Sequence, residues 1–427
     1  MTVETAAAAI VPDAALPCRD VLFDSAAMTN LFEGFGRSAL VHVDAVSPVR
    51  VNYQVGKSVR VVYRVVLDGG THTVAVRMFR RGKSAEQYGR ARPAAVDVGR
   101  LRGLLHAPAI ESVLWLFPND RKLDTLRAVL DPALVVPGAS GPVARKQLAA
   151  YAPEKSATLA CEGADGRALA YAKVAASYQA ARDYDTYTAL GAALPTNDAW
   201  LRLPAPHAYD PDRRTLWLEA IDGRRLADGA WHDGADDLRQ LGAAVARFHR
   251  LPSDRASVFE RFSPAQLTRD ADIIRTARPD VAHDVETLVG ALIATPPAEC
   301  ETACLHGDLH PKNAIACGGR LALIDVEDVA AGPPAADIGS LIASLLYLRE
   351  GQRLTVDNCA RGVRAFLAGY ESVGAVPAPA SLAWHTAAAL FIERASRSVT
   401  RIRPLGLMHL PRLVGAAHRL LDRGLDL

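Results

Sequence analysis

Short apolar runs separated by turn signals predict a β-rich region at about residues 145–230. A loop and a strand cover residues 151–162, and the Asp165-Gly166 turn that follows is of the type that closes hairpins. Further strands are predicted at 170–174 and 216–223. We therefore expect antiparallel strands joined by tight turns in this part of the chain.

The rest of the C-terminal part is mainly helical in pattern. Apolar residues recur at the spacing of one helix face from Leu238 to Phe248, which predicts a helix at 236–250. A short apolar run at 321–324 is instead typical of a buried strand. The other segments predicted to be helical are 178–192, 281–294, 341–348 and 383–403.

Residues 53–123 repeat the features of the β-rich region in the same order. Four segments match: 53–58 with 151–156, Asp68-Gly69 with Asp165-Gly166, 74–77 with 170–173, and 114–116 with 216–218. Two unrelated meanders could share strands and turns by chance, but the shared Leu-Trp-Leu favours duplication. In this comparison Arg77 takes the place of Lys173.

These patterns predict an α+β protein with three parts. Residues 1–130 form an N-terminal β-rich cap, interpreted as a degenerate copy of the second part. Residues 143–230 form a β-rich N-lobe, and residues 231–427 form a mainly helical C-lobe. A turn-rich stretch with Pro137-Gly138 and Gly141-Pro142 suits a linker between the first two parts.

Composition narrows the classes of function. The net charge of the 427 residues is only +2, which argues against a sequence-independent nucleic-acid binder. The six cysteines lack the spacing of zinc ligands, and the close pair Cys300 and Cys304 is expected to be two reduced thiols. No run of eighteen or more apolar residues occurs, and the first residues lack a positively charged start, so we expect neither a membrane span nor a secretory signal.

The most informative stretch is His306-Gly307-Asp308-Leu309-His310-Pro311-Lys312-Asn313, followed by Asp325 at the end of the buried strand. Phosphoryl transfer from ATP needs one carboxylate to orient the attacking hydroxyl and accept its proton. It also needs oxygen ligands for magnesium, which the amide of Asn313 and the carboxylate of Asp325 can supply. Asp308 and Asn313 keep the spacing of the kinase loop H-R-D-L-x-x-x-N.

This HGDLHPKN segment, with the I-D-x-E segment at 324–327, resembles the aminoglycoside phosphotransferase and choline kinase-like family over about residues 145–400. The resemblance implies a protein kinase-like bilobal fold and a cytoplasmic enzyme that uses ATP and Mg²⁺ to phosphorylate a small-molecule hydroxyl. Asp308 would be the catalytic base, and His306 would fix the loop by hydrogen bonds. His310 and Lys312 lie inside the loop and would face the phosphates.

The resemblance also implies a nucleotide site in the N-lobe. Lys173 would contact the α- and β-phosphates and pair with a helix carboxylate, for which Asp183 is the better placed candidate. The backbone from Glu219 to Ile221 would bind adenine. No G-x-G-x-x-G precedes the lysine strand, so the phosphate-covering turn is expected at residues 153–156, with Lys155 or Ser156 contributing. Asp337 would support the catalytic loop.

The acceptor pocket is expected along residues 383–403. Polycationic aminoglycosides call for a pocket lined with carboxylates, whereas this segment offers Glu393 beside Arg394, Arg397, Arg401 and Arg403. Charge complementarity therefore favours a neutral or anionic acceptor such as a sugar or sugar acid, although arginines at this spacing more often form an exposed face or pair with acidic neighbours. The alternatives are a catalytically silent nucleotide-binding regulator, an aminoglycoside-type antibiotic kinase, and a nucleotidyltransferase acting on a protein.

Overall fold

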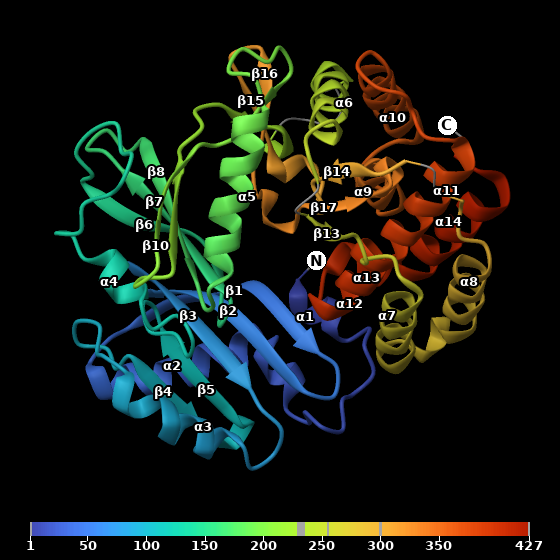
Figure 1. Ribbon diagram of the computed structural model, residues 1–427. Helices are drawn as coiled ribbons and strands as arrows, with labels where there is room; N and C mark the ends of the chain where they lie inside the picture. The colour runs from blue at the N-terminus through green and yellow to red at the C-terminus, as the bar shows by residue number, and fades with distance from the viewer. Residues whose placement is uncertain (1, 229–234, 254–255, 299–300, 426–427) are drawn as a thin grey trace.

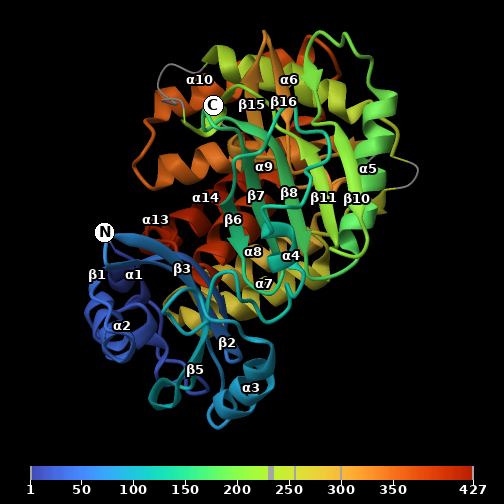
Figure 2. The ribbon, with the colours of Figure 1, turned by 90° about the vertical axis from the view of Figure 1, so that its left-hand side faces the viewer.

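The computed structural model describes residues 2–228, 235–253, 256–298 and 301–425. Two five-stranded sheets occupy one side of the molecule, and a group of helices occupies the other (Figure 1). The view in Figure 2 shows the first sheet beside the N-terminal helices in the lower part of the molecule, with the second sheet above it. Within the described residues, no helix is both long enough and apolar enough to cross a membrane.

The cap contains the first sheet. Its strands are β1 (Val43–Gln54), β2 (Ser58–Leu67), β3 (Gly70–Met78), β4 (Leu104–Ala107) and β5 (Ser112–Leu116). The order across the sheet is β1-β2-β3-β5-β4, and all neighbours are antiparallel. Helix α3 (Ser84–Ala91) connects the third strand to the fourth, and helices α1 (Val3–Ala7) and α2 (Ser25–Ala39) precede the sheet.

The second sheet repeats this topology. Its strands are β6 (Arg145–Ala152), β7 (Ser156–Glu162), β8 (Ala168–Ala175), β10 (Pro206–Asp210) and β11 (Thr215–Glu219). The order is β6-β7-β8-β11-β10, so the third strand again pairs with the fifth while the fourth lies at the edge. Helix α5 (Gln179–Ala193) again follows the third strand. Strand order and connecting helix are therefore the same in both sheets.

The two sheets pack against each other through corresponding faces. Trp115 of β5 and Trp217 of β11 lie in one buried cluster. Arg77 stands two positions after the residue that pairs with Trp115, so its side chain leaves the same face as that tryptophan. Lys173 stands next to the residue that pairs with Trp217 and leaves the opposite face. The predicted equivalence of Arg77 and Lys173 is therefore wrong, because a one-residue difference in register reverses the face of every side chain.

Most of the C-lobe is helical. Its helices are α6 (Ala235–His249), α7 (Pro264–Ala277), α8 (Ala282–Ala294), α9 (Pro334–Glu350), α10 (Val356–Glu371), α11 (Pro379–Ala389), α12 (Arg397–Thr400), α13 (Pro404–Met408) and α14 (Leu410–Arg423). The helix expected at 383–403 is a continuous α11–α12 run whose middle, Leu390–Ser396, is π-helical. Such wide turns occur often at functional sites, and this one buries Glu393 and Arg394.

Short strands hold the loops of the C-lobe. A four-stranded sheet has the order β12-β15-β16-β9, and a three-stranded sheet has the order β13-β17-β14. The strands are β9 (Leu201–Arg202), β12 (Arg224–Arg225), β13 (Ser257–Val258), β14 (Ala303–Leu305), β15 (Ala314–Cys317), β16 (Arg320–Leu323) and β17 (Ala330–Gly332). Strand β14 leads directly into the motif that begins at His306, and β16 is the buried strand expected before Asp325.

The cysteines in the described residues are free thiols, and four of them are buried: Cys161, Cys304, Cys317 and Cys359. Burial raises the pKa of Cys304 to about 12, as expected of an inert reduced thiol. Cys300, the other member of the close pair, lies outside the described residues. The same residues contain no group of three or more His, Cys, Asp or Glu side chains arranged to hold a metal ion.

Candidate active site

A cleft of about 1650 Å³ brings the three parts of the chain together. The second sheet contributes Lys155, Ser156 and Lys173 to its lining. The C-lobe contributes Asp308, Asn313 and Asp325, and the cap contributes Arg50. Strand β14 and strand β16 end at this cleft, so the loops that follow them carry the motif residues to one place.

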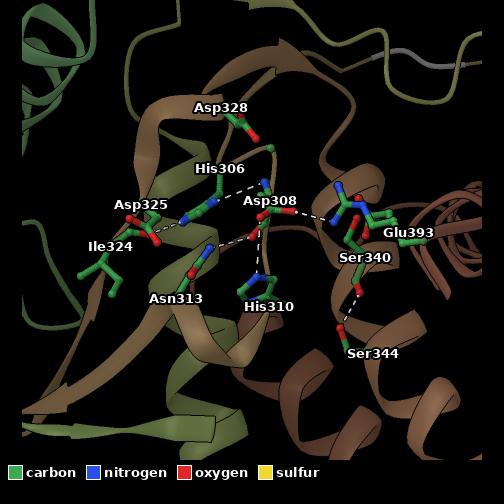
Figure 3. Close-up of polar contacts among 12 residues, drawn as sticks. His306, Asp308, His310, Asn313, Ile324, Asp325, Asp328, Ser340, Ser344 and Glu393 are labelled. Atoms are coloured by element: carbon green, nitrogen blue, oxygen red, sulfur yellow. Dashed lines mark hydrogen bonds and ion pairs between the residues drawn. The ribbon is translucent and has the colours of Figure 1, made fainter. Parts of the chain in front are cut away.

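His306 fixes the loop that carries Asp308 (Figure 3). Its buried ring Nε2 donates to the backbone oxygen of Ile324, 2.9 Å away, which ties the loop to the end of β16. Its Nδ1 accepts the backbone N–H of Asp308 at 3.4 Å. A neutral imidazole with its proton on Nε2 satisfies both bonds. His306 thus makes the loop-fixing hydrogen bonds expected of it.

Asp337, in the first turn of α9, supports the same loop from below. One carboxylate oxygen accepts the backbone N–H of His306 at 2.6 Å, and the other accepts that of Gly307 at 3.0 Å. His249 Nε2 lies 3.2 Å from the same carboxylate. Burial would raise the pKa of Asp337, but the bond from His249 and the charge of that ring outweigh burial and lower it. His249, the last residue of α6, therefore supports the loop through Asp337.

The loop requires glycine at position 307. Gly307 has φ +79°, in the left-handed region that residues with a side chain rarely adopt. A Cβ at this position would lie 2.0 Å from the backbone oxygen of Asp328. The arginine that protein kinases carry at this place cannot be accommodated with this backbone.

Asp308 is held ionised by two guanidinium groups, and the His310 ring lies beside it. Its carboxylate oxygens lie 3.3 Å from Arg397 Nη1, 3.5 Å from Arg261 Nη1 and 3.6 Å from His310 Nε2. Burial would raise the pKa of Asp308, but the charges of Arg397, His310 and Arg261 outweigh burial and lower the pKa to about 2. The carboxylate is therefore available as a proton acceptor throughout the neutral range.

His310 lies against Asp308 and is neutral. Burial, opposed in part by the charge of Asp308, lowers the pKa of His310 to about 4. Its buried Nδ1 has no hydrogen-bond partner among the described residues. Lys312, the lysine of the motif, is exposed and lines the cleft.

Asn313 and Asp325 provide oxygen atoms suited to a magnesium ion. The side-chain Nδ2 of Asn313 donates to the backbone oxygen of Asp308 at 3.1 Å, which leaves its amide oxygen as the group for a ligand. Asp325 adopts φ +59°, a conformation that is strained for a residue with a side chain and that recurs at functional positions. Mg²⁺ is a hard cation that prefers oxygen ligands, so the side chains of Asn313 and Asp325 are suited to bind it.

Lys173 reaches the loop that carries Asp325 and Glu327 rather than helix α5. Its Nζ lies 2.5 Å from Glu327 Oε2 and 3.0 Å from Asp325 Oδ1. Burial would lower the pKa of Lys173, but these two carboxylates outweigh burial and raise it, so the lysine is charged. The predicted pairing with Asp183 is not formed. The Asp183 carboxylate instead accepts from Gln179 Nε2 at 3.0 Å, and the ammonium group of Lys173 is taken by Asp325 and Glu327.

The residues expected to bind the nucleotide line the cleft. Glu219 and Ile221 lie at the end of β11, and Lys155 and Ser156 lie at the β6–β7 turn. The side chain of Glu219 pairs with Arg202 and accepts the backbone N–H of Ala205, and the backbone N–H of Glu219 donates to the backbone oxygen of Ala205 at 2.9 Å.

Three residues of the site were not predicted. Glu327 stands in the I-D-x-E segment, where a second carboxylate after Asp325 was a usable signal. Arg261 pairs with Glu393, Asp308 and Asp328, but it stands alone in the sequence and nothing there identifies it. Arg50 comes from the cap, which no motif connects with the catalytic loop.

The fold and the site define a class of protein. A β-rich lobe with an inward-facing lysine, a helical lobe, and a loop with Asp308, Asn313 and Asp325 form a protein kinase-like bilobal architecture, as the sequence predicted. The cap is an addition to that architecture.

The comparisons with known proteins agree. The profile described as "Phosphotransferase enzyme family" matches residues 170–385, about half of the chain. The chain belongs to this family, and it is a phosphotransferase with an alcohol group as acceptor. No curated protein sequence matches it.

Several solved structures resemble the chain at low sequence identity. The amicoumacin kinase hAmiN, in complex with AMP-PNP, Ca²⁺ and Ami, is 14% identical, with a TM-score of 0.48 over 70% of this chain and 93% of that one. A choline/ethanolamine kinase family protein from Mesorhizobium loti is 17% identical, with a TM-score of 0.45 over 70% and 97%. The gentamicin complex of APH(2″)-IIa is 16% identical, with a TM-score of 0.43 over 66% and 94%.

Proposed function

We propose that this chain uses ATP and Mg²⁺ to phosphorylate a hydroxyl group of a small metabolite. The observation that carries the proposal is that Lys173, from the second sheet, lines the same cleft as Asp308, Asn313 and Asp325 of the C-lobe, although it is distant from them in the sequence. Phosphoryl transfer requires a cation that binds phosphate, a proton acceptor and oxygen ligands for the metal ion. Lys173, Asp308, and the pair Asn313 and Asp325 are suited to these three roles.

Each residue has a separate task in this proposal. The Asp308 carboxylate receives a hydrogen bond from the acceptor hydroxyl, orients its oxygen towards the γ-phosphate, and takes its proton as transfer proceeds. Lys173 binds the α- and β-phosphates, and the backbone of Glu219 and Ile221 receives adenine. Asn313 and Asp325 would hold Mg²⁺, which supplies positive charge to the phosphates.

For this chemistry, the Asp308 carboxylate must accept a hydrogen bond from the acceptor hydroxyl in addition to its contacts with arginine. Its carboxylate pairs with Arg261 and Arg397, so an acceptor hydroxyl has to enter beside these guanidinium groups. Arg261 has other partners for its charge, since it also pairs with Glu393 and Asp328. The arginines then remain close enough to stabilise negative charge that develops during transfer.

The acceptor is proposed to be neutral or anionic rather than a polycation, with a sugar or sugar acid as the leading class. Support comes from the cleft wall opposite the nucleotide, where Arg394, Arg397, Arg401 and Arg403 stand together. They do not form the exposed face that their spacing alone allowed, because each lines the cleft. A polycation would meet charge repulsion there.

We also propose that the cap is a degenerate, non-catalytic copy of the N-lobe. Its support is the shared strand order, with the third strand paired to the fifth in both sheets. Among the described residues of the cap, the face that corresponds to the nucleotide face is covered by α2, so the cap offers no second nucleotide cleft.

ATP labelled separately at the γ- and α-phosphates, offered with a panel of sugars, sugar acids, amino alcohols and aminoglycosides, tests the proposal. We expect the γ-label to move to a small acceptor and the α-label to stay on the nucleotide. Transfer of the α-label to protein would indicate a nucleotidyltransferase. ATP binding without transfer to any member of the panel would favour a silent regulator.

A further inference from the structure

One wall of the cleft is unusually rich in arginine. Arg394 lies in the π-helical segment, Arg397 begins α12, and Arg401 and Arg403 follow its end. Arg50, from strand β1 of the cap, lines the same cleft, and β1 packs against α12. The cluster therefore draws on two parts of the chain that are more than three hundred residues apart.

The arginines divide into paired and unpaired members. Arg397 lies 3.3 Å from Asp308, and Arg394 is hydrogen-bonded to Ser344 and to the backbone of Ser340. Arg50, Arg401 and Arg403 have no carboxylate within ion-pair distance among the described residues. Arg50 donates only to the backbone oxygen of Tyr151, at 3.3 Å.

The unpaired arginines repel one another. Burial, together with the charges of Arg50, Arg397 and Arg403, lowers the pKa of Arg401 to about 10. Burial also lowers the pKa of Arg50 and of Arg403. Holding like charges together in a partly desolvated cleft is unfavourable, so the free protein is destabilised in a way that a bound anion would relieve.

The backbone of β1 directs Arg50 into this cluster. The pairing of β1 with β2 shifts register between Pro48 and Arg50, which marks a β-bulge. A bulge turns the strand locally and re-aims the next side chain, and bulges of this kind are common beside active sites. The exposed Val49 is the extra residue. Without the shift Arg50 would leave the other face of the sheet.

The acidic side chains of the cleft do not neutralise the cluster. Asp325 and Glu327 pair with Lys173, and Asp328 pairs with Arg261. Among the described residues, two carboxylates touch the arginine wall: Glu393 lies 3.8 Å from Arg394, and Asp308, the proposed proton acceptor, pairs with Arg397. The cations suited to ATP phosphates, Lys155 and Lys173, lie on the N-lobe side.

We propose that the acceptor is an anion whose carboxylate or phosphate group is bound by Arg50, Arg401 and Arg403, so that the cap supplies one wall of the acceptor site. The inference rests on the proposed function and adds the charge of the substrate and a role for the cap. The acceptor's hydroxyl is then presented to Asp308 from the side of Arg397, with its acidic group towards the cap.

Anion binding to the intact protein tests this inference before the acceptor is identified. The protein is first saturated with Mg·AMP-PNP, so that the nucleotide phosphates occupy their own site. Inorganic phosphate and citrate are then titrated in separate calorimetric experiments, which distinguishes a phosphate-binding from a carboxylate-binding cluster. We expect saturable binding of at least one anion.

The variants Arg50→Gln, Arg401→Gln and Arg403→Gln are each expected to weaken that binding about tenfold or more, because each removes a charge-assisted contact. The controls are Arg64→Gln in the cap and Arg412→Gln in α14, both exposed and outside the cleft, with unchanged anion affinity. Arg401→Gln should also raise the Tm, since it relieves repulsion, and this result separates loss of binding from loss of folding.

Absence of saturable anion binding, or binding that the three variants leave unchanged, would overturn the inference. The outcome is separable from the proposed function, which fails only if Mg·AMP-PNP itself does not bind or no γ-phosphoryl transfer occurs. Once an acceptor is known, Arg50→Gln should raise its KM and leave the KM for ATP unchanged.

Discussion

The two five-stranded sheets share one strand order but differ in what covers the face away from their tryptophans. In the N-lobe, that face carries Lys173 and opens on the cleft. In the cap, Val76 occupies the register position next to the residue paired with Trp115, and α2 lies over it. The same topology therefore makes a binding face in one case and a core in the other.

The cover on the cap is well packed. Phe32 of α2 meets Tyr63 of β2 edge-on, with ring centroids 5.8 Å apart, and the Tyr63 hydroxyl donates to the backbone oxygen of Leu22. Burial raises the pKa of this hydroxyl, so it remains a neutral donor. The comparison teaches that strand order does not determine function, which depends on the side chains of one face and on what lies against it.

The cap also acts on the turn expected to cover the phosphates. Glu154 of that turn pairs with Arg77, 2.5 Å away, and with Arg121, 2.7 Å away, both from the cap. Asp120 accepts the Tyr151 hydroxyl and the backbone N–H of Glu154. Arg77, which the sequence comparison aligned with Lys173, thus holds the 153–156 turn of the N-lobe in place.

The largest expected effect comes from Asp308→Asn. The substitution removes the proton acceptor, so kcat should fall by about 10²- to 10⁴-fold while ATP binding persists. ADP release with an active acceptor and calorimetry with Mg·AMP-PNP measure the two quantities. Near-native turnover in this variant would mean that Asp308 is not the base.

A second prediction tests the cover on the cap. Phe32→Ala removes a buried aromatic ring, and the free energy of unfolding of the cap should fall by about 3–5 kcal/mol. Hydrogen exchange should locate the loss in α2 and β1–β3. Exposed Leu40→Ala in the chain just after the same helix is the control and should be nearly neutral. A loss of protection confined to the C-lobe instead would contradict the packing of Phe32 on Tyr63 of the cap.

The third prediction compares the two cations directly. Lys173→Met removes a charged contact to phosphate and should lower kcat/KM for ATP by roughly 10²-fold. Arg77→Met should change it by less than about tenfold, because Arg77 acts only through Glu154, which keeps Arg121 as a partner. Equal losses in both variants would mean that the cap takes a direct part in nucleotide binding.

The smallest effect concerns pH and Asp183 of α5. Burial raises the pKa of Asp183 to about 6, so the folded state holds this proton more tightly than the unfolded state does. Its contribution to stability is present at low pH and is lost as pH rises from about 4 through about 6. Asp183→Asn should remove roughly 1–3 kcal/mol of this pH dependence, measured by denaturant unfolding at pH 4.5 and 8. An unchanged pH dependence would show that Asp183 is not the titrating group.

Much of the site could be predicted because its key residues are close in sequence. Asp308, Asn313 and Asp325 stand within one loop–strand–loop unit, so spacing alone was enough to bring them together. The repeated turn and Leu-Trp-Leu segments likewise anticipated two sheets of related topology.

The parts that could not be predicted depend on register and on long-range packing. Arg77 faces the N-lobe turn because its register in the cap sheet differs by one residue from that of Lys173 in the N-lobe sheet. Arg50 faces the cleft because a β-bulge precedes it in β1. Asp183 failed to reach Lys173 because Asp325 and Glu327 come closer from the C-lobe. Arg261 meets Asp308 only through tertiary structure.

Nucleotide stoichiometry tests most directly the claim that one sheet binds ATP and its counterpart does not. Calorimetric titration of the full chain with Mg·AMP-PNP should give one site per chain, with the same stoichiometry in Arg77→Met and a much weakened site in Lys173→Met. Two sites per chain, or one site that persists unchanged in Lys173→Met, would contradict the account.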